Sequence, residues 1–474
     1  MSHTVEKIGG TSMDRIDKLR DTLFIGDRDP DDVYQRVFVV SAFGGITNLL
    51  LEHKKTGEPG AFAAFANKDN DHGWYARLDR VAEAMMDVHS KVLDTPADIE
   101  RADAFVQDRL ENARNCLTDL RRLCSYGHFR LSENLAQTRE MLSGLGEAHS
   151  AFVTTLMLQR AGINARFLDL SGWRDEDVVS LDQRITSAMK NVDLTTELPI
   201  VTGYAQCAEG LMREYDRGYS EVTFSRLAAL TGAREAIIHK EFQLSSADPN
   251  LVGAHAVRKL GRTNYDVADQ LSNMGMEAIH PKAAKTLRQA QVPLRVTNAF
   301  EPDDPGTLID DQPTDTPAVE IVTGLELFAL ELFEQDMVGV KGYDSAILEI
   351  LSRHNVRIVS KVSNANTITH YVDSSMKVLR RVEKDLAKLY PSAEISLRAI
   401  GMASVIGRDL LGLSVLTRGL QAIAQAGLEA IGASQGPRNV DVQFIMERDA
   451  LHSAIEALHS ALVAETHVQI PVAA

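Results

Sequence analysis

The sequence predicts an α/β fold in which a mostly parallel sheet is sandwiched by helices and is followed by two small α+β modules. Over the first two thirds of the chain, short apolar runs alternate with amphipathic stretches, which is typical of a parallel sheet with crossover helices. Proline and acidic residues then gather at 301–317 and mark a change of composition. Beyond this boundary a strand and helix pattern occurs twice, at an offset of about 70 residues, which indicates a duplicated βαββαβ module.

The length and the charge of the chain disfavour several classes of protein. The chain has 474 residues, more than the roughly 250–300 at which single cores stop growing, so several domains are expected. The net charge of −16 and the absence of long Lys/Arg runs disfavour a nucleic-acid binder. No signal peptide or apolar run of about 18 residues is present, so no membrane partner is expected. Three cysteines are too few for a disulfide framework, which favours a cytoplasmic location.

The strands of the first part are predicted from their apolar runs. A helical subdomain is expected at about 79–155, where apolar residues such as Val81 and Met85 recur at helical spacing. The polar stretch 57–73, with Gly and Pro, is expected to be a loop or short insertion. The predicted strands are Thr4–Ile8, Val37–Ala42, Ala165–Leu170, Ile200–Gly203, Ala236–His239 and Leu294–Thr297.

Both copies of the repeated module are expected to start with a strand and to end with a strand and a helix. The first copy is predicted as a strand at Val338–Val340, a helix around Ile347 and Leu351, strands at Val356–Ser360 and Thr367–Val372, and a helix at Val378–Leu389. The second is predicted as strands at Ser404–Gly407, Leu428–Ile431 and Asn439–Ile445, with helices around Leu420 and Ile423 and at Leu451–Leu462.

A candidate phosphate loop follows the first strand. Gly9 and Gly10 let a phosphate approach the backbone, while the hydroxyls of Thr11 and Ser12 can donate hydrogen bonds to its oxygens. Lys7 would supply the positive charge. The loop is not a Walker A motif, because no Gly-Lys-Ser/Thr occurs in the chain. A Gly-Gly turn that only connects strand and helix remains the alternative.

Two more strands run into glycine loops. The strand at 37–40 is followed by Ser41, a Gly-Gly pair and Thr47, and ligands of open α/β sheets collect at such carboxyl ends. After the strand at 200–203, Arg217 can bind a carboxylate through two parallel hydrogen bonds. Glu221 can orient an acceptor or hold a metal, or it is only an acid in the first turn of a helix.

Weaker candidates surround these loops. Lys240 is a possible phosphate contact, although the following Ser246 and Asp248 also fit ordinary turn chemistry. Glu147 could bind a substrate amine or be a solvated acid, and Lys282 could be another site cation or a surface lysine. The fourteen histidines show no metal-ligand spacing, so no metal site in the protein is predicted.

Taken in order, these motifs resemble the aspartokinase family over nearly the whole chain. The family's Lys-Phe-Gly-Gly-Thr-Ser is similar to Lys7-Ile8-Gly9-Gly10-Thr11-Ser12, and its Arg-Gly-Gly-Ser-Asp to Arg217-Gly218-Tyr219-Ser220-Glu221. Its Val-Ser-Ala, Gly-Glu and Asp-Pro pieces match Val40-Ser41-Ala42, Gly146-Glu147 and Asp248-Pro249, and its Asn-Thr-Phe-x-Pro piece matches Asn298-Ala299-Phe300-Glu301-Pro302. The duplicated tail resembles paired ACT modules.

The resemblance implies an amino-acid-kinase-type catalytic domain at 1–310 and ACT modules at 325–398 and 399–474. It implies ATP- and Mg²⁺-dependent phosphorylation of the β-carboxylate of L-aspartate and a homodimer or larger homo-oligomer. The ACT modules of this family bind threonine, lysine or no effector, and the sequence does not decide between these. By carry-over, the catalytic residues are Lys7, Ser220 and Glu221, aspartate binds to Ser41, Thr47, Glu147 and Arg217, and the nucleotide binds to Lys240, Ser246, Asp248 and Lys282.

Some positions depart from the family pattern. Glu221 replaces the usual Asp, Tyr219 replaces a glycine, and His239–Gln243 replaces a Thr-Asp-x-x-Gly stretch. This set resembles a divergent branch that is associated with ectoine synthesis. Two alternatives remain, namely another carboxylate kinase of the same fold, such as an acetylglutamate kinase, and a catalytically silent amino-acid sensor.

Overall fold

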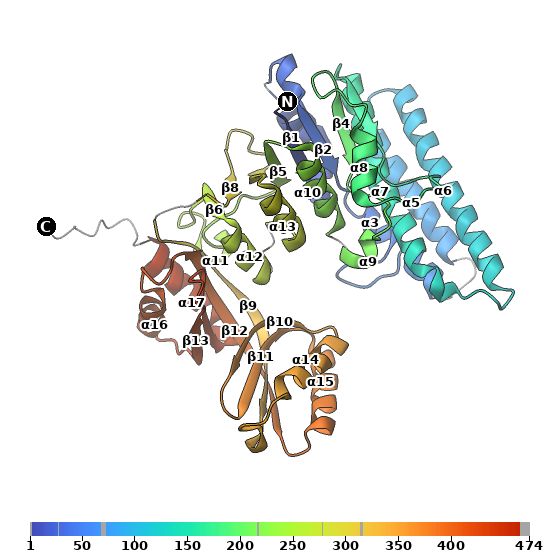
Figure 1. Cartoon of the computed structure of the whole chain (residues 1–474). Coiled ribbons are helices and arrows are strands. Elements are labelled where there is room, and N and C mark those ends of the chain that lie inside the picture. The colour runs from blue at the N-terminus through green and yellow to red at the C-terminus, as the bar shows by residue number, and fades with distance from the viewer. Residues whose placement is uncertain are drawn as a thin grey trace. The chain divides into compact units, whose positions relative to one another are not determined.

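The computed structural model describes residues 2–26, 28–67, 73–215, 218–276, 278–312 and 316–464 (Figure 1). The chain divides into two compact units. The first unit comprises Met1–Leu244, Gly261–Thr263 and Ile279–Asp311, and the second comprises Ser245–Leu260, Asn264–Ala278 and Gln312–Ala474. No helix within the described ranges is long and apolar enough to cross a membrane.

The first sheet has the predicted α/β form. In the described part of the chain its eight strands lie in the order β3-β4-β2-β1-β5-β7-β8-β6. The first six of these pair in parallel, while β8 is antiparallel to β7. All six strands that the sequence predicts are confirmed, within two residues at each end. The bounds are β1 Thr4–Ile8, β2 Arg36–Val40, β3 Ala165–Leu168, β4 Leu198–Thr202, β5 Glu235–Lys240, β6 Arg262–Asn264, β7 Leu294–Asn298 and β8 Thr307–Asp310.

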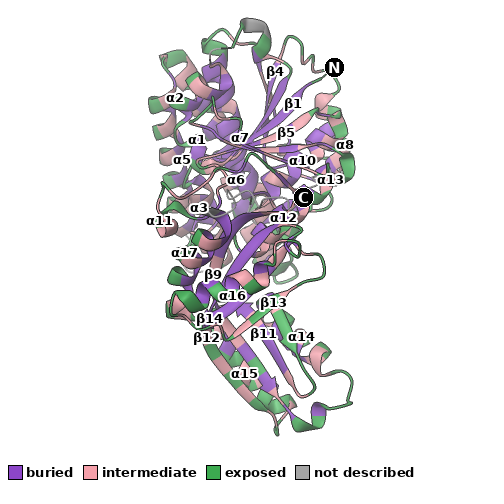
Figure 2. Cartoon of the chain, turned by 90° about the vertical axis from the view of Figure 1, so that its left-hand side faces the viewer, coloured by how far each residue is buried: buried purple, intermediate pink, exposed green. Residues whose placement is uncertain are grey.

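The central strands are buried on both faces, as a parallel sheet between helix layers requires (Figure 2).

The buried carboxylate of Glu6 in strand β1 is paired with Arg36 and His239. The carboxylate of Glu6 accepts hydrogen bonds from Arg36 Nε at 2.7 Å, from Arg36 Nη2 at 3.0 Å and from His239 Nε2 at 2.8 Å. Burial opposes ionisation, but Arg36 and His239 outweigh it and hold the pKa of Glu6 well below its usual range.

Three long helices span the stretch around 79–155 that the sequence predicts to be helical, and they lie side by side in Figure 1. The second begins at Pro96, where the Thr95 side chain caps the first turn by accepting from the Asp98 N–H. The stretch predicted as a loop at 57–73 contains a short helix, and residues 68–72 of it lie outside the described residues. Helices of the first unit are α1 Gly10–Met13, α2 Ile16–Leu19, α3 Ile46–Leu50, α4 Ala61–Ala66, α5 Gly73–Val92, α6 Pro96–Cys124, α7 Leu135–Arg160, α8 Leu181–Met189, α9 Leu211–Tyr215, α10 Tyr219–Thr231 and α13 Pro281–Ala290.

The second unit contains an antiparallel sheet with strand order β10-β11-β9-β12-β14-β13. The long strands β9 and β12 pair along nearly their whole lengths, from Ala318 opposite Arg408 to Phe333 opposite Glu394. The first half of β9 therefore completes the sheet of the second module, although it precedes the first module in sequence. The bounds are β9 Ala318–Phe333, β10 Arg357–Ser363, β11 Thr367–Asp373, β12 Glu394–Arg408, β13 Gly432–Gln435, β14 Asp441–Glu447, α11 Pro249–Val252, α12 Tyr265–Asn273, α14 Tyr343–Arg353, α15 Met376–Leu389, α16 Val415–Gln425 and α17 Leu451–His459.

Two strand predictions in this unit are wrong. Val338–Val340 is a turn, in which Gly339 has a φ of +77° and both valines are more than half exposed. The apolar run that provides the first strand of that module lies earlier, in β9. Leu428–Ile431 precedes the short strand β13 and is not part of it. The helices predicted around Ile347 and around Ile423 are confirmed and pack on separate apolar clusters.

Candidate active site

The carboxyl ends of the central parallel strands bring together most of the predicted catalytic residues. Lys7 lies near the end of β1, Ser41 follows β2, and Lys240 ends β5. Ser220 and Glu221 lie in the first turn of α10, which follows β4. Because this edge of an open α/β sheet is where ligands bind, the arrangement marks it as the candidate site.

Lys7 and Glu221 form the charged centre of this cluster. Lys7 Nζ lies 3.2 Å from Glu221 Oε1, and both side chains are largely buried. The other carboxylate oxygen, Oε2, accepts a hydrogen bond of 2.5 Å from the backbone N–H of His280. Burial alone would raise the pKa of Glu221, but Lys7, Lys240 and the His280 N–H lower it below its ordinary value. Glu221 is therefore ionised and holds the Lys7 ammonium in place.

Glu147 is the second buried carboxyl group of the site and behaves in the opposite way. It lies in the middle of α7 with 3% of its surface exposed, so it is not the solvated acid of the alternative interpretation. Its Oε2 atom has no hydrogen-bond partner among the described residues. Burial raises its pKa to about 8, against the attraction of Lys7 and the backbone N–H groups of Tyr204 and Ala42. A buried carboxyl group with an unused acceptor is suited to bind a cationic group of a ligand.

Two serines and a glycine complete the wall beside Glu147. Ser41 Oγ lies 3.5 Å from Ser220 Oγ. A Cβ atom added at Gly203 would lie 2.8 Å from the Ser220 Cβ and 2.9 Å from Glu147 Oε2. Only glycine therefore fits between these groups, and the strand β4 can approach the site closely.

The predicted phosphate loop turns directly from β1 into α1. A Cβ at Gly10 would lie 2.9 Å from the backbone carbonyl oxygen of Ala42, so this glycine is also required by close packing. Gly9 precedes the first turn of α1, and Thr11 is exposed. Ser12, in contrast, is buried, and its Oγ donates a hydrogen bond of 2.8 Å to Glu241.

The remaining predicted residues are not all brought into this cluster. Thr47 lies half-buried in the short helix α3, and Arg217 lies outside the described residues. The exposed Lys282 pairs with Glu214 at 2.5 Å.

The two other predicted nucleotide contacts, Ser246 and Asp248, belong to the second unit. Ser246 is buried there, where its Oγ lies 2.8 Å from His459 Nε2 and accepts a hydrogen bond from the Arg258 N–H. Asp248 caps the short helix α11 by accepting from the Asn250 N–H.

Comparisons with known proteins agree with this geometry. Residues 3–298 match the model of the amino acid kinase family. The chain is 48% identical, over the full length of both proteins, to "Aspartate kinase Ask_Ect" of Stutzerimonas stutzeri. The chain belongs to the aspartate kinase family. It is also 24% identical to "Aspartokinase 2, chloroplastic" of Arabidopsis thaliana, over 96% of this chain and 84% of that protein.

The aspartate kinase fold is also evident from solved structures. E. coli aspartokinase III in complex with lysine and aspartate gives a TM-score of 0.73 at 18% identity, covering 97% of this chain and 99% of that one. The same enzyme with aspartate and ADP gives a TM-score of 0.70, again at 18% identity, covering 97% and 100%. These likenesses confirm the predicted fold class.

Some residues of this aspartate kinase site were not predicted from the sequence. The backbone N–H of His280 holds Glu221, and the Tyr204 N–H reaches Glu147. Asp14 accepts a hydrogen bond of 2.5 Å from the Gly44 N–H, which ties the first loop to the second. Tyr204 directly follows a predicted strand and a glycine, so that position could have been identified, whereas a backbone donor such as His280 leaves no signal in residue type.

Proposed function

We infer that this aspartate kinase transfers the γ-phosphoryl group of ATP to the β-carboxylate of L-aspartate and forms 4-phospho-L-aspartate. The main support for the roles of individual residues is the cluster of Lys7, Glu221 and Glu147 at the carboxyl ends of the parallel strands. Phosphoryl transfer requires mainly that two anions are held in line and that the charge on the transferred group is neutralised.

Each residue of the cluster has a role that its environment supports. Lys7, fixed by Glu221, neutralises the transferred phosphoryl group, and the glycine loop beside it leaves room for phosphate oxygens. Glu147 binds the α-ammonium group of aspartate through its unpartnered oxygen. Ser41 and Ser220 donate hydrogen bonds to the aspartate carboxylates.

We retain Thr47 and Arg217 as further aspartate ligands, from the family motif alone. Lys240 is the proposed nucleotide contact with the best support, because it lies close enough to lower the pKa of Glu221. The proposal for Lys282, Ser246 and Asp248 rests on sequence alone, and the hydroxyl of Ser246 is already bonded within the second unit.

Mg²⁺ fits this donor set as a metal that arrives with ATP. Mg²⁺ in ATP-dependent enzymes is held mainly by phosphate oxygens, water and one or two carboxylates. Glu221 would supply a carboxylate beside the phosphates. The ion would neutralise charge on the bridging oxygens.

We further propose that the second unit binds lysine or threonine as an effector and pairs with a second copy of the chain. Lysine and aspartate are bound in the E. coli aspartokinase III structure of the same fold. Strands β10 and β13 form the two edges of the sheet and offer backbone groups for pairing. Light scattering tests this assembly, and a monomer at working concentration would contradict it.

The biosynthetic context is also a proposal. The name of the S. stutzeri relative supports a role in supplying phosphoaspartate for ectoine as well as for the aspartate-family amino acids. The chain has three free thiols, Cys116, Cys124 and Cys207, which suit the reducing cytoplasm.

Trapping the acyl phosphate with hydroxylamine tests the activity directly. The protein is incubated with ATP, MgCl₂ and L-aspartate, and aspartyl hydroxamate is measured. Product should form only when all components are present, and acetylglutamate and other carboxylates should give none. Hydroxamate with another acid would favour a different carboxylate kinase. Effector binding without product or ADP would instead identify an amino-acid sensor.

A further inference from the structure

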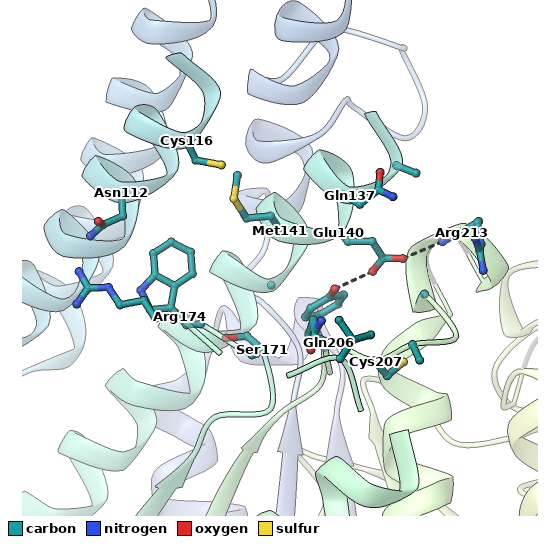
Figure 3. Close-up of a pocket in the computed structure, with 18 residues that line it drawn as sticks. Asn112, Cys116, Gln137, Glu140, Met141, Ser171, Arg174, Gln206, Cys207 and Arg213 are labelled. Atoms are coloured by element: carbon teal, nitrogen blue, oxygen red, sulfur yellow. Dashed lines mark hydrogen bonds between the residues drawn. The ribbon is translucent and has the colours of Figure 1, made fainter. Parts of the chain in front are cut away.

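A cavity is lined in part by Tyr204, the residue whose backbone N–H reaches Glu147. It has a volume of about 600 Å³ and is enclosed by helices α6 and α7, the loop after β3 and the loop after β4 (Figure 3). Cys116 and Met141 lie on the wall formed by the helices, and Gln206 and Cys207 lie on the wall formed by the loop after β4. This volume is within the range of about 300–1,000 Å³ that is typical of small-molecule sites.

The lining of the cavity defines the chemistry of a ligand. Most of the wall is apolar or aromatic, with Met141, Trp173 and Tyr204 as its large side chains. The indole N–H of Trp173 is buried and has no acceptor among the described residues. A buried donor without an acceptor is unfavourable, so the indole would gain a hydrogen bond if ligand binding turned its N–H toward an acceptor.

One positive charge on the wall is placed to meet an anion. The Arg213 guanidinium lines the cavity and donates a hydrogen bond to the backbone carbonyl oxygen of Glu209. Arg174 also lines the cavity, but it is paired with Asp108 at 2.8 Å. The carboxylate of the lining, Glu140, is held by uncharged donors, because Oε2 accepts from Tyr204 Oη at 2.7 Å and Oε1 accepts from the Met212 and Arg213 N–H groups at 2.7 and 3.1 Å. The ligand that fits has an apolar, preferably planar body and one carboxylate.

The cavity and the aspartate site share structural elements. Glu140, Gly144 and Glu147 are spaced at i, i+4 and i+7 and so lie on one face of α7. Tyr204 joins the two sites, since its hydroxyl binds Glu140 and its backbone N–H reaches Glu147. A ligand that displaces Tyr204 or Glu140 must therefore alter the surroundings of Glu147.

We propose that this cavity is a second small-molecule site, for a compact apolar carboxylic acid, and that its occupancy changes the affinity of the enzyme for L-aspartate. The coupling rests on the proposed role of Glu147, but binding in the cavity does not. By thermodynamic linkage, L-aspartate must change the affinity for the cavity ligand by the same factor.

Fluorescence of Trp173 provides a direct test of binding. The chain has two tryptophans, and Trp74→Phe leaves Trp173 as the sole reporter. The probe is 2-naphthoate, with neutral 2-naphthamide as its isostere. Naphthoate should change the fluorescence saturably and bind about tenfold more tightly than the amide, as expected for a charge-assisted contact. No saturable change, or equal affinity for acid and amide, would overturn the proposal.

Substitutions locate the site. Ala136 is an exposed residue of α7 that lines the cavity, and Ala136→Phe should weaken naphthoate binding by at least about tenfold through loss of space. Ala97, exposed on α6 outside the lining, gives the matched control Ala97→Phe, which should bind naphthoate normally. Equal binding by both variants would refute the assignment of this cavity.

The coupling is measured without turnover. The dissociation constant of naphthoate is compared with and without saturating L-aspartate, and a change of about fivefold or more is expected. The KM for L-aspartate should change by a similar factor when naphthoate is present. Saturable binding with no effect of aspartate would overturn the coupling, whereas failure of the hydroxamate assay with intact naphthoate binding would count against the kinase activity alone.

Discussion

If Glu147 binds the α-ammonium group of L-aspartate, as proposed above, the affinity for L-aspartate depends on pH in a way that can be calculated. Its pKa of about 8 means that the carboxyl group is mostly protonated at pH 7 in the free enzyme. Binding of the α-ammonium group requires the ionised form, so the proton must leave. With this pKa, the apparent Kd exceeds the intrinsic value by a factor of about 11 at pH 7 and about 1.3 at pH 8.5.

Aspartate affinity should therefore increase about eightfold between pH 7 and pH 8.5, and about 0.9 proton should be released per aspartate bound at pH 7. Isothermal titration calorimetry in buffers of different ionisation enthalpy measures both quantities. A flat affinity together with no proton release at pH 7 would refute the role of Glu147 as the ammonium ligand.

The variant Glu147→Gln supplies the control. It should lose most of the affinity for L-aspartate and all of the proton release.

The folded-state pKa of Glu147 is raised from an ordinary 4.5 to about 8, so the folded protein binds more protons than the unfolded chain in this interval. The contribution of Glu147 to the free energy of unfolding should therefore fall by up to about 1.4 kcal/mol per pH unit as the pH rises from 4.5 to 8. Glu147→Gln should lack this loss, so its Tm relative to the wild type should rise with pH over this range.

Four further substitutions test the other roles. Lys7→Ala should lower kcat by about 10²-fold or more, because a cation at the transferred group is lost, while circular dichroism stays unchanged; substantial activity would reject the phosphate loop. Arg217→Lys should raise the KM for aspartate more than it lowers kcat, because the two parallel hydrogen bonds are lost, and an unchanged KM would remove Arg217 from the site. Gly203→Ala should reduce activity, since the added methyl group would lie 2.8 Å from the Ser220 Cβ, and wild-type kinetics would contradict that packing. Ser246→Ala should lower the free energy of unfolding by about 1–3 kcal/mol in thermal melts without raising the KM for ATP; a raised KM would restore Ser246 to the nucleotide site.

The sequence predicts the catalytic edge of the sheet well because the signals there are local. Buried parallel strands are continuous apolar runs, and each is followed by a loop rich in Gly, Ser or Thr that marks its carboxyl end. The strand β1 is predicted without error, and Lys7 and Ser41 are confirmed at strand ends. These features depend on neighbouring residues and need no knowledge of tertiary contacts.

Sequence-based predictions fail where the structure around a residue depends on contacts with segments that are distant in the chain. The valines at 338 and 340 form an apolar run, but the first strand of that module is supplied by β9, which pairs with a segment about 70 residues later. Glu147 was compatible with a solvated acid until the packing of α7 against Ala42 was known. The hydroxyl of Ser246 fits a turn equally well, and only its pairing with His459 shows where it is used.

The roles proposed for the two carboxyl groups near Lys7 account for how an acidic protein can bind two anionic substrates. Glu221 lies near Lys7 and Lys240 and accepts a hydrogen bond from a backbone N–H, so its pKa is lowered and its negative charge holds Lys7, the proposed catalytic cation. Glu147 is buried with weaker compensation, so its pKa is raised and it remains neutral until a cationic group arrives. Opposite shifts in neighbouring acids assign different roles to them. In the proposed mechanism, Glu147 therefore adds no negative charge to the free site that would repel ATP, and it becomes charged only together with the ammonium group of the substrate.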